Sequence, residues 1–365
     1  MKRLSISPVT RIEGHAQVSI DLDDKGEVAG AHFNVVELRG FEKFLVGAAV
    51  EEAPRITPRI CGICPAAHHL ASAKAVDQIF GAEVPVTGRK LRELLMHGQY
   101  IHSHALHFFM LAAPDFLIGH DAPPQERNVL GLAKKAPDIA KKAIEVRKLG
   151  QRITESVGGK PIHPSNAVPG GMSKALSEAD RTNLLSMAER GLSIAQEGWE
   201  TARGIMNSAD RTFGSVETAF MGMTNNNLYS PYEGRVQMVG ADKSPIGSFT
   251  GSEYLQYIEE YSLPSTYLKF CKLKSGGQHY RVGPLARLNI CEGMGTPRAD
   301  AALKEYRSAF GPFVQSPLAY NIARYIEFLS SCERAVALLQ DASISGSDVR
   351  MPVSDVKKRR GVGIV

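Results

Sequence analysis

Two cysteines three positions apart are the residues of this sequence best placed to do chemistry. Cys61-Gly62-Ile63-Cys64 puts two thiols within reach of one metal ion, and Pro65 directly after them suits the first position of a helix. The free amide groups and the dipole of a helix start favour an anionic sulfur, which is the form that binds metals. The spacing therefore predicts two ligands of one metal site at the mouth of a helix.

Other sites also use this spacing. A structural zinc site needs two further ligands, and a thioredoxin-like redox pair needs a βαβ setting, which the sequence around Cys61 does not show. His68 and His69 follow closely, but their spacing is unusual for zinc and no second Cys-x-x-Cys is present. A helical protein stabilised by one zinc ion stays open as the simplest alternative.

Helical periodicity dominates the chain after this cysteine pair. Apolar residues recur at intervals of three and four, which places them on one face of a helix. Gly81 and Ser177 suit a helix end and a helix start, and Pro114 is expected to end the second helix. The predicted helices cover residues 65–80, 90–112, 137–157, 177–206, 301–310 and 318–339.

The first part of the chain has a different pattern. Apolar and polar residues alternate over 16–22, and a second run covers 28–36 beyond a turn at Lys25-Gly26, which predicts a β-hairpin. Residues 207–296 are richer in glycine, proline and aromatic residues, which indicates loops and short strands.

These patterns predict a mainly α protein with a small amino-terminal β element, of the α+β class. We expect one domain over residues 1–365, with a β-containing segment at 1–60 and a mostly helical body at 61–365. No internal repeat or low-complexity linker divides it.

Six motifs in order along the chain resemble those of nickel-iron hydrogenase large subunits. They are RIEGH at 11–15, ELRGFE at 37–42, RICGICPAAH at 59–68, SHALHFF at 103–109, the segment from HP at 163 to GG at 171, and YRVGPLARLN at 280–289. The wording of the motifs is most similar to the cytoplasmic, viologen-reducing hydrogenases that supply electrons to heterodisulfide reductase. The resemblance covers nearly the whole chain and implies that family's fold.

The resemblance also implies roles for individual residues. Cys61 would bind nickel terminally, and Cys64 would bridge nickel to an iron that carries carbon monoxide and cyanide. Glu13 matches the first residue of the family's proton relay; without the motif it would be interpreted as a capping or salt-bridged surface acid. Glu42 matches a position that binds structural magnesium in many members; alone it would be interpreted as a surface residue.

His68 lies four positions after Cys64, so on a helix it can lean back toward the sulfur and tune the metal by a hydrogen bond. A core histidine with ordinary partners is an equally good interpretation, and both stay open. The histidines on the next predicted helix are expected to form a buried hydrogen-bonded network. They are His97, His102, His104 and His107. Ser103 stands where many hydrogen-uptake relatives have an aspartate, so that carboxylate's role is not carried over.

The family's centre uses four cysteines, and its second pair lies in a motif of the type Asp-Pro-Cys-x-x-Cys-x-x-His that this sequence lacks. Three explanations stay open: a truncated sequence, a split gene whose second product supplies the pair, or a degenerate subunit without catalysis. The remaining cysteines, Cys271, Cys291 and Cys332, match no ligand position and are expected to be buried thiols.

The expected function is reversible cleavage of dihydrogen into protons and electrons. The chain has no cysteine set for an iron-sulfur cluster, so an iron-sulfur small subunit is expected as partner, with an adaptor and heterodisulfide reductase beyond it. The alternative is a non-catalytic scaffold subunit, as in complex-I-like assemblies.

Charge and hydropathy exclude two kinds of partner. A net charge of +5, from 43 basic and 38 acidic residues, is too small for a nucleic-acid footprint. No apolar run reaches transmembrane length, and the start has no secretory pattern, so the cytoplasm is the expected compartment.

Overall fold

A computed structural model describes residues 2–365 and divides the chain into two compact units. The smaller unit contains the chain up to Gly47 together with Tyr254–His279, and the larger contains Ala48–Glu253 and Tyr280–Val365. Each unit therefore combines stretches that lie far apart in the sequence. The organisation expected from the sequence, one domain with a boundary after residue 60, stays a prediction.

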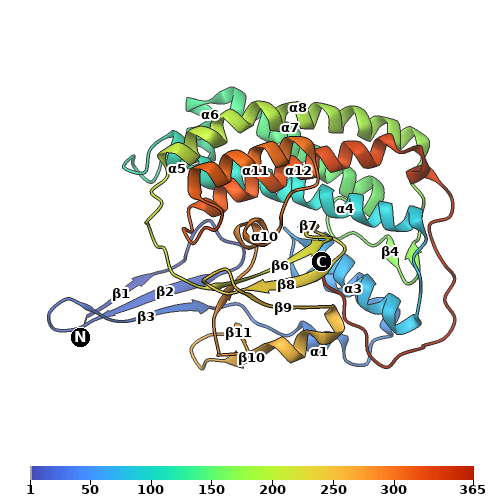
Figure 1. Cartoon of the computed structure of the whole chain (residues 1–365), viewed down its shortest axis with the longest axis horizontal. Helices are drawn as coiled ribbons and strands as arrows, with labels where there is room; N and C mark the ends of the chain where they lie inside the picture. The colour runs from blue at the N-terminus through green and yellow to red at the C-terminus, as the bar shows by residue number, and fades with distance from the viewer. Residues whose placement is uncertain (1) are drawn as a thin grey trace. The chain divides into compact units, whose positions relative to one another are not determined.

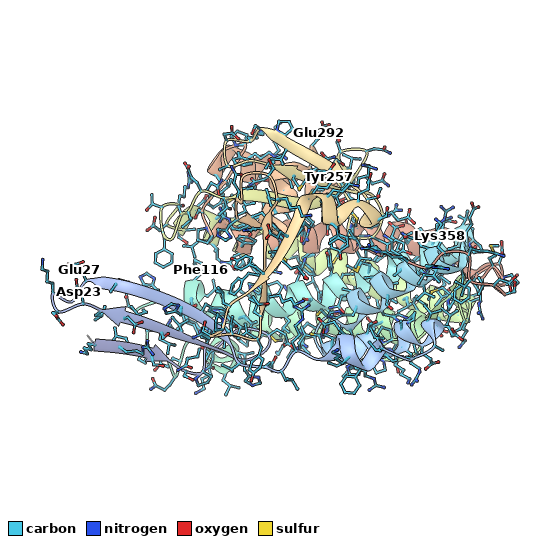
Figure 2. The ribbon with its side chains drawn as sticks, turned by 90° about the horizontal axis from the view of Figure 1, so that it is seen from below. Asp23, Glu27, Phe116, Tyr257, Glu292 and Lys358 are labelled. Carbon is cyan, nitrogen blue, oxygen red and sulfur yellow. The ribbon has the colours of Figure 1, made fainter. Side chains whose placement is uncertain are left out.

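The smaller unit contains an antiparallel sheet in the order β1-β2-β3. Its strands are β1 (Lys2–Ile6), β2 (Ala16–Leu22) and β3 (Val28–Val35). The predicted hairpin is confirmed: the turn carries Asp23 and Glu27 at its base, and the amide of Asp23 donates to the carbonyl of Glu27 at 2.9 Å (Figure 2). Strand β1 was not predicted from the sequence. All its side chains are exposed, so no buried face produces an alternating pattern.

A second hairpin completes the smaller unit. Its strands are β10 (Ile258–Ser262) and β11 (Lys269–Leu273). The unit also contains two short helices, α1 (Phe41–Leu45) and α9 (Tyr254–Tyr257). Thr266, in the loop between β10 and β11, accepts a hydrogen bond through its hydroxyl from the amide of Val35 at 2.9 Å. This bond joins the second hairpin to β3.

The larger unit is built around long helices that run side by side (Figure 1). They are α4 (Val86–Ala105), α7 (Pro137–Gly158), α8 (Glu178–Ser208), α11 (Pro297–Phe310) and α12 (Ala319–Gln340). The unit also contains α3 (Pro65–Phe80) and the short helices α2 (Ala53–Ile56), α5 (Ala113–Leu117), α6 (Val129–Lys135) and α10 (Pro284–Ile290). Each long helix matches a predicted one, because a wide apolar face gives a strong periodic signal.

The expectation that Pro114 ends the second helix is wrong. The helix begins at Val86, continues beyond Ala105 as a π-helical segment, Leu106–Ala112, and passes into α5. Pro114 lies in the first turn of α5, where a missing amide hydrogen breaks no regular helical bond. A proline is therefore tolerated within a continuous helical segment at the point where the π-helical pattern changes back to the α-helical one.

The region predicted to hold short strands forms a five-stranded sheet in the order β12-β6-β8-β9, with β7 paired to β6. The strands are β6 (Ala219–Asn225), β7 (Leu228–Tyr229), β8 (Arg235–Val239), β9 (Pro245–Phe249) and β12 (Tyr280–Arg281). A small hairpin, β4 (Ala167–Val168) with β5 (Gly171–Met172), lies beside α3 and α4. The α+β class is thus confirmed. Among residues 2–365, no helix is both long and apolar enough to cross a bilayer.

Candidate metal centre

The cysteine pair sits where a short helical turn gives way to α3. Cys61 follows the turn Thr57–Ile60 in an extended conformation, with φ of −145° and ψ of 132°. Cys64 is the N-cap of α3, and Pro65 occupies its first turn. The helix ends at Gly81, whose φ of 62° suits a left-handed cap. The predicted placement of the pair at a helix mouth is confirmed by these bounds.

Two backbone amides point at one of the sulfurs. The amides of Ile63 and Cys64 each lie 3.3 Å from Cys61 Sγ, and Cys61 is buried while Cys64 is half-buried. Amide donors of this kind stabilise the negative charge that a thiolate carries when it binds a metal. The turn is therefore folded in a form suited to a metal thiolate.

The two histidines of α3 differ in their surroundings. His69 is fully buried; its Nδ1 donates to the carbonyl of Pro54 at 2.6 Å, and its Nε2 accepts from the amide of Ala167 at 2.9 Å. Burial lowers the pKa of His69 to about 4, so the ring is neutral and joins α3 to α2 and β4 through these two hydrogen bonds. His68 is half-buried one turn after Cys64, and burial lowers its pKa. The role predicted for His68 stays a prediction.

Sequence reasoning missed a third support of the cysteine turn. Gln99 on α4 is buried, and its Nε2 donates to the carbonyl of Ile63 at 2.8 Å. No local pattern marks this residue, because it lies 36 positions after its partner and looks like any polar residue on a helix.

The carboxyl-terminal segment, residues 357–365, lies along α3. Lys358 donates its amide to the carbonyl of Ile79 at the far end of the helix (Figure 2). Further along, Gln78 exchanges two hydrogen bonds with the backbone of Val362, at 2.9 and 3.1 Å. Lys74 then donates through Nζ to the carbonyl of Ile364 at 2.6 Å. The segment therefore runs antiparallel to α3, toward the end that carries the cysteines.

Glu13 and Glu42, the two acids given roles by resemblance, belong to the smaller unit, whereas Cys61, Cys64 and His68 belong to the larger. Glu13 is exposed in the loop before β2. Glu42 lies in the first turn of α1, where its carboxylate accepts from Arg39 Nε at 2.5 Å. Its own backbone amide and then Arg39 lower the pKa of Glu42. Both roles stay predictions.

Two histidines of α4 lie close to carboxylates. His104 Nε2 lies 3.0 Å from Glu327, and His97 Nε2 lies 3.7 Å from Glu93. Burial lowers the pKa of His104 and of His107 to about 4. The predicted buried network is confirmed only in part: His104 is buried and bonded to Glu327, whereas His102 and His107 are half-buried and the Nδ1 atoms of all four histidines have no hydrogen-bond partner among the described residues. In the part of the chain that the structure describes, no three or more His, Cys, Asp or Glu residues gather as a metal site.

The other cysteines divide into two kinds. Cys291 and Cys332 are buried, and burial raises the pKa of both thiols, that of Cys291 to about 12. The expectation of burial is wrong for Cys271, which is half-buried on β11 because a two-stranded hairpin has few neighbours to cover it. All three have surroundings unlike the Cys61 turn.

Comparisons with known proteins agree with this geometry. Residues 39–127 match the family model of nickel-dependent hydrogenases, and residues 3–38 match a HoxL-like model. One relative belongs to the F420-non-reducing hydrogenase Vhu of Methanococcus voltae and is 44% identical over 371 residues, which span 100% of this chain and 88% of the relative. The beta chain of the NAD-reducing hydrogenase HoxS from Cupriavidus necator is 37% identical, spanning 100% and 79%.

Solved structures give the same answer. An NAD⁺-reducing NiFe hydrogenase in the H₂-reduced state matches with a TM-score of 0.91 and 39% identity, covering 100% of this chain and 82% of that one. A NiFeSe hydrogenase from Dm. baculatum shares the fold at 22% identity, with a TM-score of 0.78 and coverage of 97% and 82%. The fold, the cysteine turn and the relatives agree, and the chain belongs to the large-subunit family of nickel-dependent hydrogenases.

Proposed function

We propose that this chain supplies one half of a nickel-iron centre that reversibly cleaves dihydrogen into protons and electrons. The observation that carries the proposal is the Cys61 turn, in which two amides converge on one sulfur and a second cysteine follows at the helix start. Membership of the nickel-dependent hydrogenase family supports it.

The residues present fit such a centre. Thiolates are soft ligands that suit nickel and iron, and the two amides directed at Cys61 Sγ would stabilise the charge of a metal-bound thiolate there. Cys61 would hold nickel as a terminal ligand, and Cys64 would bridge it to an iron with carbon monoxide and cyanide ligands. When bound, the metal pair supplies the Lewis-acid and redox chemistry that dihydrogen cleavage needs.

Two further thiolates are required, and the chain's other cysteines are poor candidates. Cys291 and Cys332 are buried with raised pKa values, and Cys271 lies on a strand of the smaller unit. We propose that the second pair comes from residues outside this sequence, on the same polypeptide or on a partner polypeptide.

Three residues other than the two cysteines would have roles at or near the metal centre. Glu13 would accept a proton and pass it outward, as a carboxylate placed for proton transfer does. His68, one turn after Cys64, would donate a hydrogen bond to that sulfur and so tune the metal. Glu42 would contribute an oxygen ligand to a structural magnesium ion, which prefers carboxylates.

Electrons would leave through a partner. We propose an iron-sulfur small subunit, then an adaptor and a heterodisulfide-reductase-type acceptor in the cytoplasm, with methyl viologen as an artificial acceptor. Relatives described as F420-non-reducing hydrogenases support an electron acceptor other than F420.

An infrared spectrum of the complex, purified anaerobically from its native host, tests the proposal. Stretching bands of iron-bound carbon monoxide and cyanide are expected, with nickel bound in the same preparation. Cys61→Ser and Cys64→Ser should abolish both, whereas Cys271→Ser should leave them intact because Cys271 lies outside the larger unit. A well-folded complex without bands or nickel would overturn the proposal and leave a scaffold protein; zinc at one per chain would point to the structural-zinc alternative.

A further inference from the structure

We propose that Gln99 is a positioning residue that tunes the sulfur of Cys61 through a single peptide group. The inference rests on the proposed function, since a metal-bound thiolate is what would be tuned. Gln99 does not contact the sulfur itself; it binds the backbone of the turn that surrounds the sulfur.

The peptide group between Ile63 and Cys64 has a hydrogen bond at each end. Its carbonyl, on Ile63, accepts from Gln99 Nε2 at 2.8 Å. Its N–H, on Cys64, points at Cys61 Sγ at 3.3 Å. A donor at the carbonyl polarises the whole peptide and makes its N–H a stronger donor, since hydrogen bonds in a chain reinforce one another. The carboxamide and the sulfur therefore lie at opposite ends of one dipole.

Gln99 is held firmly enough to fix this dipole. Its side chain is only 5% exposed, so water does not compete well for the Ile63 carbonyl. The adjacent Gly98 packs against α7 so closely that a Cβ at this position would lie 2.6 Å from Ile153 Cγ2. On α7, a Cβ on Gly150 would lie 2.6 Å from the carbonyl oxygen of Gly98. The backbones of α4 and α7 therefore lie in close contact beside Gln99. This contact holds the backbone from which the Gln99 side chain extends.

Removing the donor should change the sulfur more than the fold. Without Gln99 the Cys64 N–H donates more weakly, so the Cys61 thiolate keeps more electron density. Hydrogen bonds to metal-bound sulfurs are one of the means by which proteins set reduction potentials. The expected shift of the centre's midpoint potential on losing the donor is toward more negative values.

The test uses the complex and the metal-free full chain. Gln99→Met keeps the length of the side chain but not its donor, and Gln99→Leu removes the donor with a shorter apolar side chain. In the complex, both should retain nickel while shifting the midpoint potential and the carbon monoxide and cyanide bands. In the metal-free chain, amide hydrogen exchange at residues 61–64 should become faster in both variants.

Asn289→Leu is the matched control. Asn289 is also a buried amide that donates to a backbone carbonyl, that of Val314 at 2.8 Å, and it makes no bond to the cysteine turn. It should destabilise the chain without shifting the potential or the exchange at 61–64. Unchanged exchange in Gln99→Met, or faster exchange with an unchanged potential, would overturn the inference. A wild-type complex without infrared bands would instead refute the proposed function, while the exchange experiment would still report on Gln99.

Discussion

Arg287 and Glu327 form a bidentate ion pair around a carboxylate with no exposed surface. Arg287 Nε lies 2.6 Å from Oε1 and Nη2 lies 2.7 Å from Oε2, while His104 approaches Oε2 at 3.0 Å. Burial by itself raises the pKa of Glu327, but Arg287 and then His104 outweigh it and lower the pKa to about 2. One carboxylate thus joins α4, α10 and α12.

This pair predicts an asymmetric mutational response. Glu327→Ala should lower the free energy of unfolding by about 3–5 kcal/mol, because it leaves the buried guanidinium of Arg287 without its carboxylate partner. Combining Glu327→Leu with Arg287→Met should recover much of that loss, since no charge stays buried. Urea unfolding of the full chain, followed by circular dichroism, measures both. The exposed pair of Arg190 and Glu145 is the control, and Glu145→Ala should cost no more than about 1 kcal/mol. A double variant as unstable as Glu327→Ala would contradict the argument.

Stability should fall as pH falls from about 6.5 toward 4. Burial lowers the pKa of His69, His104 and His107 to about 4 in the folded chain, whereas these residues titrate near 6.5 when unfolded. Over this window the unfolded state binds more protons, so each histidine reduces the free energy of unfolding by about 1.4 kcal/mol per pH unit.

Urea unfolding of the full chain at pH 7, 6 and 5 measures this slope. His69→Gln removes one of the three titrating groups, so its slope should be smaller by about one proton even though the variant is less stable at every pH. An undiminished slope in that variant would show that His69 does not remain neutral in the fold.

The carboxyl-terminal segment should not tolerate a methyl group at residue 363. A Cβ on Gly363 would lie 1.9 Å from the carbonyl oxygen of Ala71, so Gly363→Ala should release the segment from α3. Faster hydrogen exchange over 361–365 is expected. Gly204→Ala is the control, because nothing lies within 4 Å of a Cβ there, and it should be stabilising by up to about 1 kcal/mol within α8. Unchanged protection in Gly363→Ala would mean that the helix and segment can separate slightly without cost.

The proposed proton transfer predicts a separation between metal assembly and turnover. Glu13→Gln should leave the infrared bands in place while lowering dihydrogen-dependent reduction of methyl viologen by about 10²–10⁴-fold, the usual contribution of a placed acid or base. Glu27→Gln, on the turn of the same sheet, should match the wild type in both measurements. Full activity in Glu13→Gln would remove Glu13 from the proton path.

Local signals account for the parts of the molecule that the sequence predicted well. Pro65 and Gly81 mark the ends of α3, and Ser177 caps α8 by accepting from the amide of Asp180, each within a few residues of its effect. The Cys61 and Cys64 pair was found for the same reason. Short-range chemistry is visible in one sequence because both partners stand in one window.

Long-range pairings were not predictable in this way. Gln99 reaches a carbonyl 36 positions earlier, and Arg287 pairs with an acid 40 positions later. Neither residue differs in type from ordinary polar residues on a helix, so only the folded structure shows that α4 meets the cysteine turn and that α10 meets α12. The exposed strand β1 was missed for a related reason, since no buried face imposes alternation on it.

The antiparallel segment along α3 has a consequence for the order of folding. Lys74 and Ile364 are 290 positions apart, so their contact can form only after all the intervening residues have been synthesised. At about 5–20 residues per second, α3 leaves the ribosome roughly 15–60 s before its partner segment. During that interval Lys74 and Gln78 lack their backbone partners on residues 362 and 364. The face of α3 that contacts this segment therefore packs later in folding than the face that contacts α4, which follows α3 closely in the sequence.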